Sequence, residues 1–511
     1  MGLQDLTFYD LICQNAETYQ SRNAWYEAES GETLRFCEYK TSVDRLASGL
    51  QNAGLKKGDR IGVLGKNSLE YFLIYGAAAA LGAIVLPVNW RLSADEVVFN
   101  LADCTPVALF YDPEYQALID ENRNRLPSVT HFYSLAPGAK SHAGIDSLME
   151  NDGRFTRLET SADDGFVIIH TAAVAGRPRG ALLSHGNVLC ADIHLMHLFG
   201  LSCEDVHLNL LPLFHVAGLF MTISSFHAGA LSINMVKFDA PRAVKLIAEK
   251  NISLMFDFAP ILSAILEEQE KTGTPISSLR AVLGIETPEI IEAYQRRTRG
   301  RFYCLYGQTE TSAIVTLGRY DDRPGSAGRP VALSRVKLLN DNDEPVAAGE
   351  TGEIVMQGPL VFKGYWGLDD ENKNTFRNGW HHTGDLGRFD ADGFLWFEGR
   401  KPDKELIKPG GENVYPAEVE KVICEHPAVE AAVVFGVPDP KWKEAISAVC
   451  QLKPGKTLSE DALISFVGKK IARYKKPSHV AFTDEISRLK DGSPDRAAIK
   501  KQYGDRWAAI R

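Results

Sequence analysis

This chain of 511 residues has no closely spaced cysteine pairs, no excess of positive charge and few long hydrophobic runs. Its eight cysteines are scattered and none forms a CxxC pair, which predicts reduced thiols in a cytosolic protein rather than a disulfide framework. The formal net charge of −10 argues against non-specific nucleic-acid binding, although a local basic patch is compatible with it. The N-terminus lacks a basic segment followed by an apolar one, so we expect no secretory signal and a cytoplasmic location.

One uncharged stretch, residues 71–90, approaches the length of a membrane span. Gly82 and Pro87 divide it, and the residues 84–86 between them are β-prone. We therefore predict a buried helix that stops at Gly82, followed by a short buried strand, and no membrane span.

The composition and length indicate a globular protein with more than one domain. Hydrophobic residues make up 45% and charged residues 24% of a chain too long for one compact core. Up to about residue 330, short apolar runs alternate with amphipathic stretches, which predicts parallel α/β layers. The apolar runs are 60–65, 83–88, 108–112, 166–170 and 253–257; helices are expected at 93–101, where Ser93 and Glu96 form a capping box, and at 241–250.

The chain changes character after residue 330. Short strands split by turns predict a β-barrel-like subdomain over 331–400, and a charged, Pro- and Gly-containing stretch at 399–413 is typical of a linker. Helices expected at 416–424 and 459–471 flank a strand at 429–437. The predicted fold is thus a large N-terminal α/β domain, residues 1–402, and a small C-terminal α+β domain, residues 403–511.

The segment VIIHTAAVAGRPRGALLSHGN, residues 167–187, has the layout of a phosphate-binding loop. Glycine-rich loops bind phosphates because bare backbone N–H groups can approach the oxygens closely. Here the middle, residues 172–175, carries no hydroxyl and no glycine, although Thr171, Gly176 and Arg179 remain. Alone, this motif is also compatible with a simple connector between a strand and a helix.

Other segments make the signal specific. They are LPLFHVAG (211–218), LYGQTETS (305–312), GWHHTGDLGRFDADGFLWFEGR (379–400) and ELIKPGGENVYPAEVE (405–420), in that order. Together with the loop, they resemble the adenylate-forming superfamily of acyl-CoA synthetases, luciferases and peptide-synthetase adenylation domains, over roughly residues 30–500. The resemblance implies ATP-dependent activation of a carboxylic acid, transfer of the acyl group to coenzyme A, a requirement for Mg²⁺ and a small C-terminal domain that is mobile.

The resemblance also implies roles for individual residues in nucleotide binding. The family's loop has three further hydroxyls, one further glycine and a Lys where Arg179 stands, so the loop is expected to grip pyrophosphate differently. The remaining assignments are Thr309 at the α-phosphate, Glu310 at Mg²⁺, Tyr306 at adenine, Gly307 in the nucleotide site, Asp385 and Arg400 at the ribose, and Gly284 and Glu286 in the turn against adenine and substrate.

The acid and thiol sites are expected near His215, in LPLFH, and near Gly410 and Gly411, which match the loop along the pantetheine path. The acyl pocket should draw on residues around Phe214, His215, Met221, Phe256 and Gly284, which favours a hydrophobic fatty, alicyclic or aromatic acid. The resemblance implies a domain hinge at either Asp403 or Glu405. His194 and His197 share a helix spacing, but a zinc site is disfavoured because no further ligand lies nearby in sequence.

The sharpest departure from the family lies near the C-terminus. Where the family has its catalytic Lys after a Gly, this chain has Ser493 after Gly492. A neutral Ser cannot supply the charge that bridges carboxylate and α-phosphate, and Lys490, three residues earlier, is a candidate replacement. A weakened or reverse-running homologue, and an adenylation enzyme serving a carrier protein, therefore remain alternatives to the CoA ligase, and a homodimer remains open.

Overall fold

Strands and covering helices alternate in the computed structural model, which describes residues 6–138, 142–174, 177–401, 406–439, 442–488 and 494–508. The chain divides into a large unit, residues 1–90, 101–169 and 180–399, and a small unit, residues 91–100, 170–179 and 400–511. The predicted mixed α/β class is confirmed. The predicted boundary between residues 402 and 403 falls within the segment 402–405, which lies outside the described residues.

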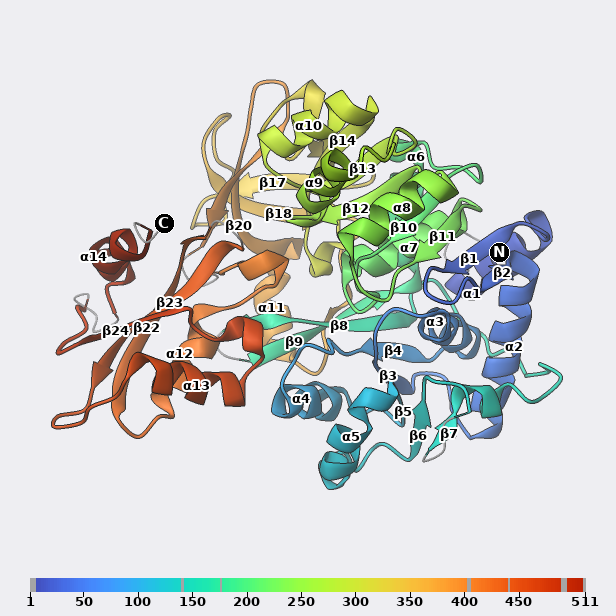
Figure 1. The fold of residues 1–511 in the computed structure, drawn as a ribbon, viewed down its shortest axis with the longest axis horizontal. Helices are drawn as coiled ribbons and strands as arrows, with labels where there is room; N and C mark the ends of the chain where they lie inside the picture. Colours follow the sequence, from blue (N-terminus) through green and yellow to red (C-terminus); the bar gives the residue numbers. More distant parts are fainter. Residues whose placement is uncertain are drawn as a thin grey trace. The chain divides into compact units, whose positions relative to one another are not determined.

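The first large sheet brings the carboxyl ends of six parallel strands to one edge. Among the described residues its order is β16-β15-β14-β13-β12-β10-β11-β1-β2, and all neighbours from β14 to β1 run parallel. The parallel strands are β1 (Asn23–Glu27), β10 (Val206–Asn209), β11 (Leu231–Asn234), β12 (Leu254–Phe258), β13 (Ala281–Ile285) and β14 (Arg301–Tyr306); the antiparallel edges are β2 (Thr33–Arg35), β15 (Thr316–Arg319) and β16 (Arg329–Pro330). Figure 1 shows α8 (Ala240–Lys250), α9 (Ile261–Thr272) and α10 (Pro288–Thr298) gathered on one face of this sheet. Side chains at the ends of β12, β13 and β14 therefore lie on adjacent strands.

The second large sheet has the order β19-β9-β8-β4-β3-β5-β6-β7 in the described chain. Its strands are β3 (Arg60–Leu64), β4 (Ile84–Pro87), β5 (Ala108–Tyr111), β6 (His131–Ser134), β7 (Ala143–Gly144), β8 (Gly165–Val174), β9 (Arg177–Ser184) and β19 (Gly364–Tyr365). The strands from β8 to β7 pair in parallel, whereas β19 pairs antiparallel with β9. The apolar runs predicted as strands are all strands in the structure.

The uncharged stretch at 71–90 folds as its sequence predicts. The helix α3 (Leu69–Leu81) ends at Gly82, whose φ of 65° places it in the left-handed region, and β4 follows. Every residue of α3 except Glu70 is buried, so the helix is apolar because it lies in the core. Within the described residues, no helix is long and apolar enough to cross a membrane.

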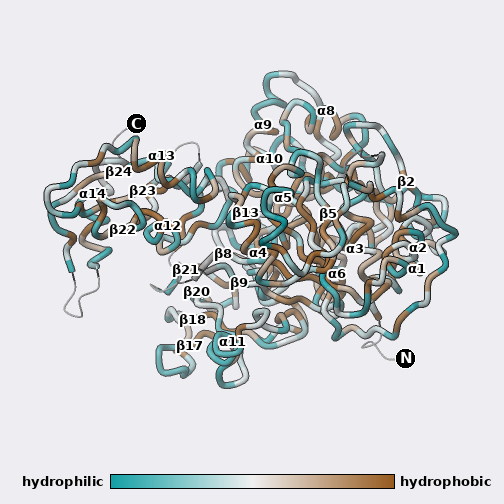
Figure 2. Tube along the Cα trace, turned by 90° about the horizontal axis from the view of Figure 1, so that it is seen from below, coloured by the Kyte–Doolittle hydropathy of each residue, from teal (hydrophilic) through white to brown (hydrophobic). Residues whose placement is uncertain are grey.

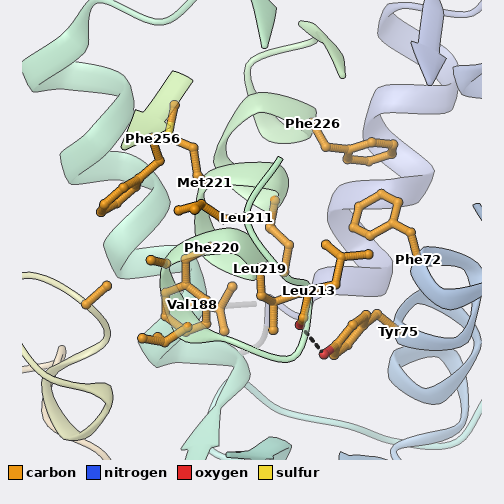
Figure 3. Packing of buried hydrophobic residues seen from close by; sticks show 14 of the residues in the cluster. Phe72, Tyr75, Val188, Leu211, Leu213, Leu219, Phe220, Met221, Phe226 and Phe256 are labelled. Atoms are coloured by element: carbon orange, nitrogen blue, oxygen red, sulfur yellow. Dashed lines mark hydrogen bonds between the residues drawn. The ribbon is translucent and has the colours of Figure 1, made fainter. Parts of the chain in front are cut away.

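The core of the large unit surrounds α3 and α7 (Val216–His227). Phe72 of α3 stacks on Trp25, with ring centroids 5.1 Å apart, and contacts Phe226 of α7. Tyr75 donates a hydrogen bond to the carbonyl of Leu213, 2.8 Å away, which ties α3 to the segment before α7 (Figure 3). The further helices α1 (Phe8–Thr18), α2 (Phe36–Asn52) and α6 (His185–Phe199) complete this core, and Figure 2 shows hydrophobic segments concentrated inside the large unit.

An antiparallel sheet follows in the chain, with the order β17-β18-β20-β21 among the described strands. These are β17 (Arg335–Leu339), β18 (Gly352–Gln357), β20 (His381–Phe389) and β21 (Leu395–Arg400), and α11 (Asp369–Thr375) precedes β20. The β-rich character predicted for 331–400 is confirmed, but the sheet is open rather than barrel-like, because β17 and β21 form its two edges.

The strand β20 contains a bulge at the Thr-Gly-Asp part of the conspicuous 379–400 motif. Glu353 of β18 pairs with Leu386, and Val355 pairs with His382, so residues 383–385 stand opposite Ile354 alone. Gly384 in this bulge has a φ of 70°, a conformation that favours glycine. Bulges re-aim the side chains that follow them, here Asp385.

The small unit has its own sheet and core. Its sheet has the order β22 (Val429–Asp439), β23 (Lys443–Leu452) and β24 (His479–Thr483), and its helices include α12 (Pro416–Cys424), α13 (Glu460–Lys470) and α14 (Arg496–Ala508). The predictions for α12, α13 and the strand at 429–437 are confirmed. The capping box is also present: Ser93 and Glu96 exchange backbone-to-side-chain hydrogen bonds of 2.8 and 3.4 Å at the start of α4 (Ala94–Cys104).

The phosphate-loop motif differs from its expected conformation. Strand β8 continues through Val174 and strand β9 begins at Arg177, and these strands are neighbours in the sheet. Most of the segment expected to form a loop is therefore extended. Thr171 and the residues 172–174 that replace the family's hydroxyls and glycine are compatible with strand, since Thr and Val favour extended backbone and none is glycine.

Candidate active site

Three polar side chains of the large unit meet at the end of β14. The Tyr306 hydroxyl donates to Oδ2 of Asp385 at 2.8 Å, and the Gln308 amide donates to the same oxygen at 2.6 Å. Gln308 also donates to the carbonyl of Thr383 at 3.0 Å. Tyr306 and Asp385 are both buried. Because two donors hold one carboxylate oxygen, the orientation of Asp385 is fixed before any ligand arrives.

An apolar surface adjoins this group. Tyr306 stacks on Phe397 of β21, with ring centroids 6.0 Å apart and an interplanar angle of 30°. Phe397 is 49% exposed, so an apolar ring beside Tyr306 stays partly open to solvent. This surface is compatible with the stacking of a planar base that the sequence predicts for Tyr306.

Glu310 is the predicted metal ligand, and it is held in a short 3₁₀ turn, Thr309–Thr311. Its buried carboxylate accepts a hydrogen bond from the Tyr365 hydroxyl at 2.8 Å, and its carbonyl accepts one from the Phe362 amide at 2.9 Å. Thr309 beside it is half-buried. One fixed carboxylate is a donor set that fits Mg²⁺, since this ion commonly takes one or two carboxylates together with phosphate oxygens.

Two of the predicted site glycines, Gly284 and Gly307, stand where the fold leaves no room for a side chain. A Cβ atom on Gly284 would lie 2.1 Å from the carbonyl oxygen of Asp257 on the neighbouring strand β12. A Cβ atom on Gly307 would lie 2.0 Å from the carbonyl oxygen of Ala313. Both contacts are with backbone, which cannot rotate away as a side chain can.

We therefore expect Gly284→Ala to destabilise the large unit by about 1–3 kcal/mol, because the added methyl group forces β12 and β13 apart. Urea unfolding followed by circular dichroism measures this change. The matched variant Gly468→Ala, in α13, adds a methyl group with its nearest neighbour at 3.4 Å and should be neutral or stabilising. Equal stabilities of the Gly284 variant and the parent chain would contradict the steric explanation.

The residues predicted around the acid are mostly packed. His215 is the N-cap of α7, where its Nδ1 accepts from the Ala217 amide at 3.3 Å, and its ring meets Phe258 edge-on at 6.1 Å. The predicted pocket residues Phe214, Met221 and Phe256 are buried, and Figure 3 shows Met221 and Phe256 close together. Glu286, at the turn after β13, accepts from the Thr287 amide at 2.9 Å.

His194 is engaged in the core rather than exposed for a metal. Its Nδ1 lies 2.6 Å from the carbonyl oxygen of Cys190, and its Nε2 contacts the carbonyl oxygen of Ala332. Backbone carbonyls thus face both ring nitrogens of His194.

The small unit contains the remaining described candidates. The Thr171 hydroxyl donates to the carbonyl of Arg179 at 3.3 Å, across β8 and β9. Gly410, with a φ of 59°, donates to the carbonyl of Trp442 at 3.0 Å, and a Cβ atom there would lie 2.8 Å from the indole ring. Arg400 is half-buried at the end of β21, and Gly411 ends the turn Pro409–Gly411. Gly176, Asp403, Glu405, Lys490 and Ser493 lie outside the described residues.

Sequence reasoning missed three supporting side chains: Gln308, Tyr365 and Glu353. Gln308 lies inside the LYGQTETS motif. Its contact with Asp385 could have been predicted by assuming that this motif packs against the 379–400 motif. Tyr365 and Glu353 lie in short strands outside the recognised segments, and only the strand pairing reveals their partners.

The chain is similar to known enzymes along almost its whole length. The family model described as AMP-binding enzyme matches residues 13–366, and the model described as AMP-binding enzyme C-terminal domain matches residues 418–492. An indoleacetate–CoA ligase of Aromatoleum aromaticum is 34% identical over 476 residues, 92% of this chain and 93% of the relative. A long-chain-fatty-acid–CoA ligase of Mycobacterium tuberculosis is 31% identical over 503 residues, covering 96% and 98% of the two chains. A solved structure of o-succinylbenzoate CoA synthetase from Bacillus subtilis, in complex with a product analogue, superposes with a TM-score of 0.85 at 27% identity, covering 97% of this chain and 98% of that one.

Proposed function

This chain belongs to the family of AMP-binding enzymes and is an acyl- or aryl-CoA ligase, and we propose that its substrate is a hydrophobic fatty, alicyclic or aromatic carboxylic acid. The observation that carries the proposal is the buried, apolar character of Phe214, Met221 and Phe256, the residues expected around the acid. The relatives are named for an indole acid and for long-chain fatty acids, which both have apolar bodies.

In the proposed reaction, a carboxylate oxygen of the acid attacks the α-phosphorus of ATP. The bond from that phosphorus to pyrophosphate breaks, and an acyl-adenylate forms. The thiol of coenzyme A then attacks the acyl carbon and loses its proton to solvent, while AMP leaves. Both steps gather negative charge, so fixed cations and donors must stabilise it.

We assign the nucleotide contacts to the large-unit residues described above. Asp385 accepts from the ribose hydroxyls, Tyr306 and Phe397 pack against adenine, and Thr309 donates to the α-phosphate. Glu310 would hold Mg²⁺, which supplies charge neutralisation for the phosphates when it is bound. The preorganised carboxylates of Asp385 and Glu310 support this assignment, because each has a hydrogen bond that fixes one oxygen.

Replacing Glu310 by Gln should raise the Mg²⁺ concentration needed for half-maximal activity by about tenfold or more, because the ligand loses its charge. The amide oxygen can still accept from the Tyr365 hydroxyl, so the local packing is kept. The rate of AMP formation, measured against free Mg²⁺ at fixed ATP, reports the change. The exposed Glu371→Gln on α11 serves as a control, and an unshifted Mg²⁺ dependence in the Glu310 variant would remove this residue from the metal site.

The first experiment is incubation with ATP, Mg²⁺, coenzyme A and a panel of fatty, alicyclic and aromatic acids, followed by mass spectrometry. We expect acyl-CoA and stoichiometric AMP with at least one hydrophobic acid. Acyl-adenylate without acyl-CoA would show a different acceptor. Turnover only with short polar acids would contradict the hydrophobic substrate.

A further inference from the structure

The bulge that contains Asp385 is hydrogen-bonded to one buried carboxylate, that of Glu353. Glu353 of β18 is 3% exposed, and its Oε1 accepts from the Gly384 amide at 3.0 Å. The neighbouring Thr383 hydroxyl donates to the carbonyl of Ile354 at 2.6 Å and accepts from the Asp385 amide at 3.1 Å. Three successive residues of the bulge are thus fixed by hydrogen bonds, and the central one depends on a side chain from the adjacent strand.

The second carboxylate oxygen of Glu353 contacts a guanidinium group and an imidazole ring. Its Oε2 lies 3.1 Å from Arg377 and 3.1 Å from Nδ1 of His382. His382 is 2% exposed, and its Nε2 has no hydrogen-bond partner among the described residues. Arg377 also pairs with Asp343 at 3.0 Å. The charge of Glu353 is therefore compensated, as burial of a carboxylate requires.

A bulge of this kind needs such an anchor. Residues 383–385 stand opposite Ile354 alone, so the regular backbone pairing offers no acceptor for the Gly384 amide. A side chain must then accept its hydrogen bond. Without an acceptor this amide would be buried and unsatisfied, and the turn could relax toward the regular register. A one-residue change of register would point Asp385 to the other face of the sheet, away from Tyr306 and Gln308.

We propose that Glu353 is a positioning residue of the nucleotide site, which acts by holding the Gly384 amide so that the Asp385 carboxylate faces the ribose hydroxyls. This inference rests on the proposed role of Asp385 in the ligase reaction. It assigns a specific function to a carboxylate that touches neither substrate nor metal.

The test compares three replacements of Glu353 in the full chain, using isothermal titration calorimetry with AMP. Glu353→Gln keeps an oxygen that can accept from Gly384 and should retain AMP affinity within about threefold. Glu353→Asp keeps the charge but withdraws the acceptor by one methylene, and Glu353→Ala removes it; both should weaken AMP binding by about tenfold or more. Should the Ala variant fail to fold, the comparison of Gln with Asp decides the question.

Steady-state kinetics separates positioning from general stability. We expect KM for ATP to rise in the Asp and Ala variants, while KM for the acid and for coenzyme A stays within about twofold of the parent enzyme. Asp343→Asn, which perturbs the same charge cluster without touching the bulge, should leave AMP affinity unchanged. Unchanged AMP affinity in folded Asp and Ala variants, or equal losses in the Gln and Ala variants, would overturn the inference.

The variant Asp385→Ala distinguishes this inference from the proposed function. If it loses AMP affinity while the Glu353 variants keep theirs, only the positioning role is wrong. If Asp385→Ala itself binds AMP normally, the ribose assignment is wrong, and the positioning role falls with it.

Discussion

Replacing Asp385 by Ala should lower kcat/KM for ATP by at least about 100-fold. A charged acceptor contributes about 1.5–3 kcal/mol per hydrogen bond, and two ribose hydroxyls are expected to donate to this carboxylate. The change also leaves the Tyr306 hydroxyl and the Gln308 amide without the oxygen that they now share. Rates of acyl-CoA formation at varied ATP and saturating acid and coenzyme A measure the loss.

A surface aspartate provides the matched control for this prediction. Asp370, on α11, has a side chain that is 94% exposed and pairs only with solvent-facing Lys373 in the described structure. Asp370→Ala should keep kcat/KM for ATP within about twofold of the parent enzyme, since surface ion pairs contribute little. A folded Asp385→Ala enzyme with less than about threefold loss would show that another group binds the ribose.

The second large effect is an increase in the rate of adenylation. Ser493→Lys should speed the adenylation half-reaction by about tenfold or more, because a fixed cation between the carboxylate and the α-phosphate stabilises developing charge that a hydroxyl cannot. This prediction rests on the sequence position after Gly492, which matches the family's lysine. Exchange of labelled pyrophosphate into ATP, driven by the acid, isolates this step.

The thioester half-reaction gives the internal control, because the family's lysine serves adenylation and not thiol transfer. Acyl-CoA formation from supplied acyl-adenylate should therefore be unchanged in Ser493→Lys. Lys490→Ala tests whether a neighbouring lysine already supplies the charge: a loss of pyrophosphate exchange would assign it that role, and an unchanged rate would exclude it. A slower Ser493→Lys enzyme would mean that the active site is built around another group.

The fold was largely predictable because its signals are local. The stretch at 71–90 contains its own stop signal in Gly82, and α12 begins and ends at the predicted residues 416 and 424. The open form of the 331–400 sheet was not predictable, because closure depends on which strands pair rather than on where strands occur. The extended conformation of residues 171–174 was missed for a related reason, since a family motif indicates a role but not a backbone conformation.

The site was predictable only in part. Tyr306, Glu310 and Asp385 stand in long, specific motifs, and the structure brings Tyr306 and Asp385 into contact. Glu353 and Tyr365 have no such signal, because a buried carboxylate or hydroxyl on a strand looks the same in sequence whether it supports a ligand or a core. Their partners, Gly384 and Glu310, become evident only from the register of β18 with β20 and from the packing of β19.

The close approach at Gly284 limits how this enzyme can diversify. Any side chain there meets the backbone of Asp257, so variation at this position is closed. The next residue, Ile285, is 49% exposed and belongs to the same strand end. Evolution toward new acid substrates, in nature or in a directed library, should therefore vary Ile285 and keep Gly284. Of these two adjacent positions, one is fixed by the backbone packing and the other is free to change.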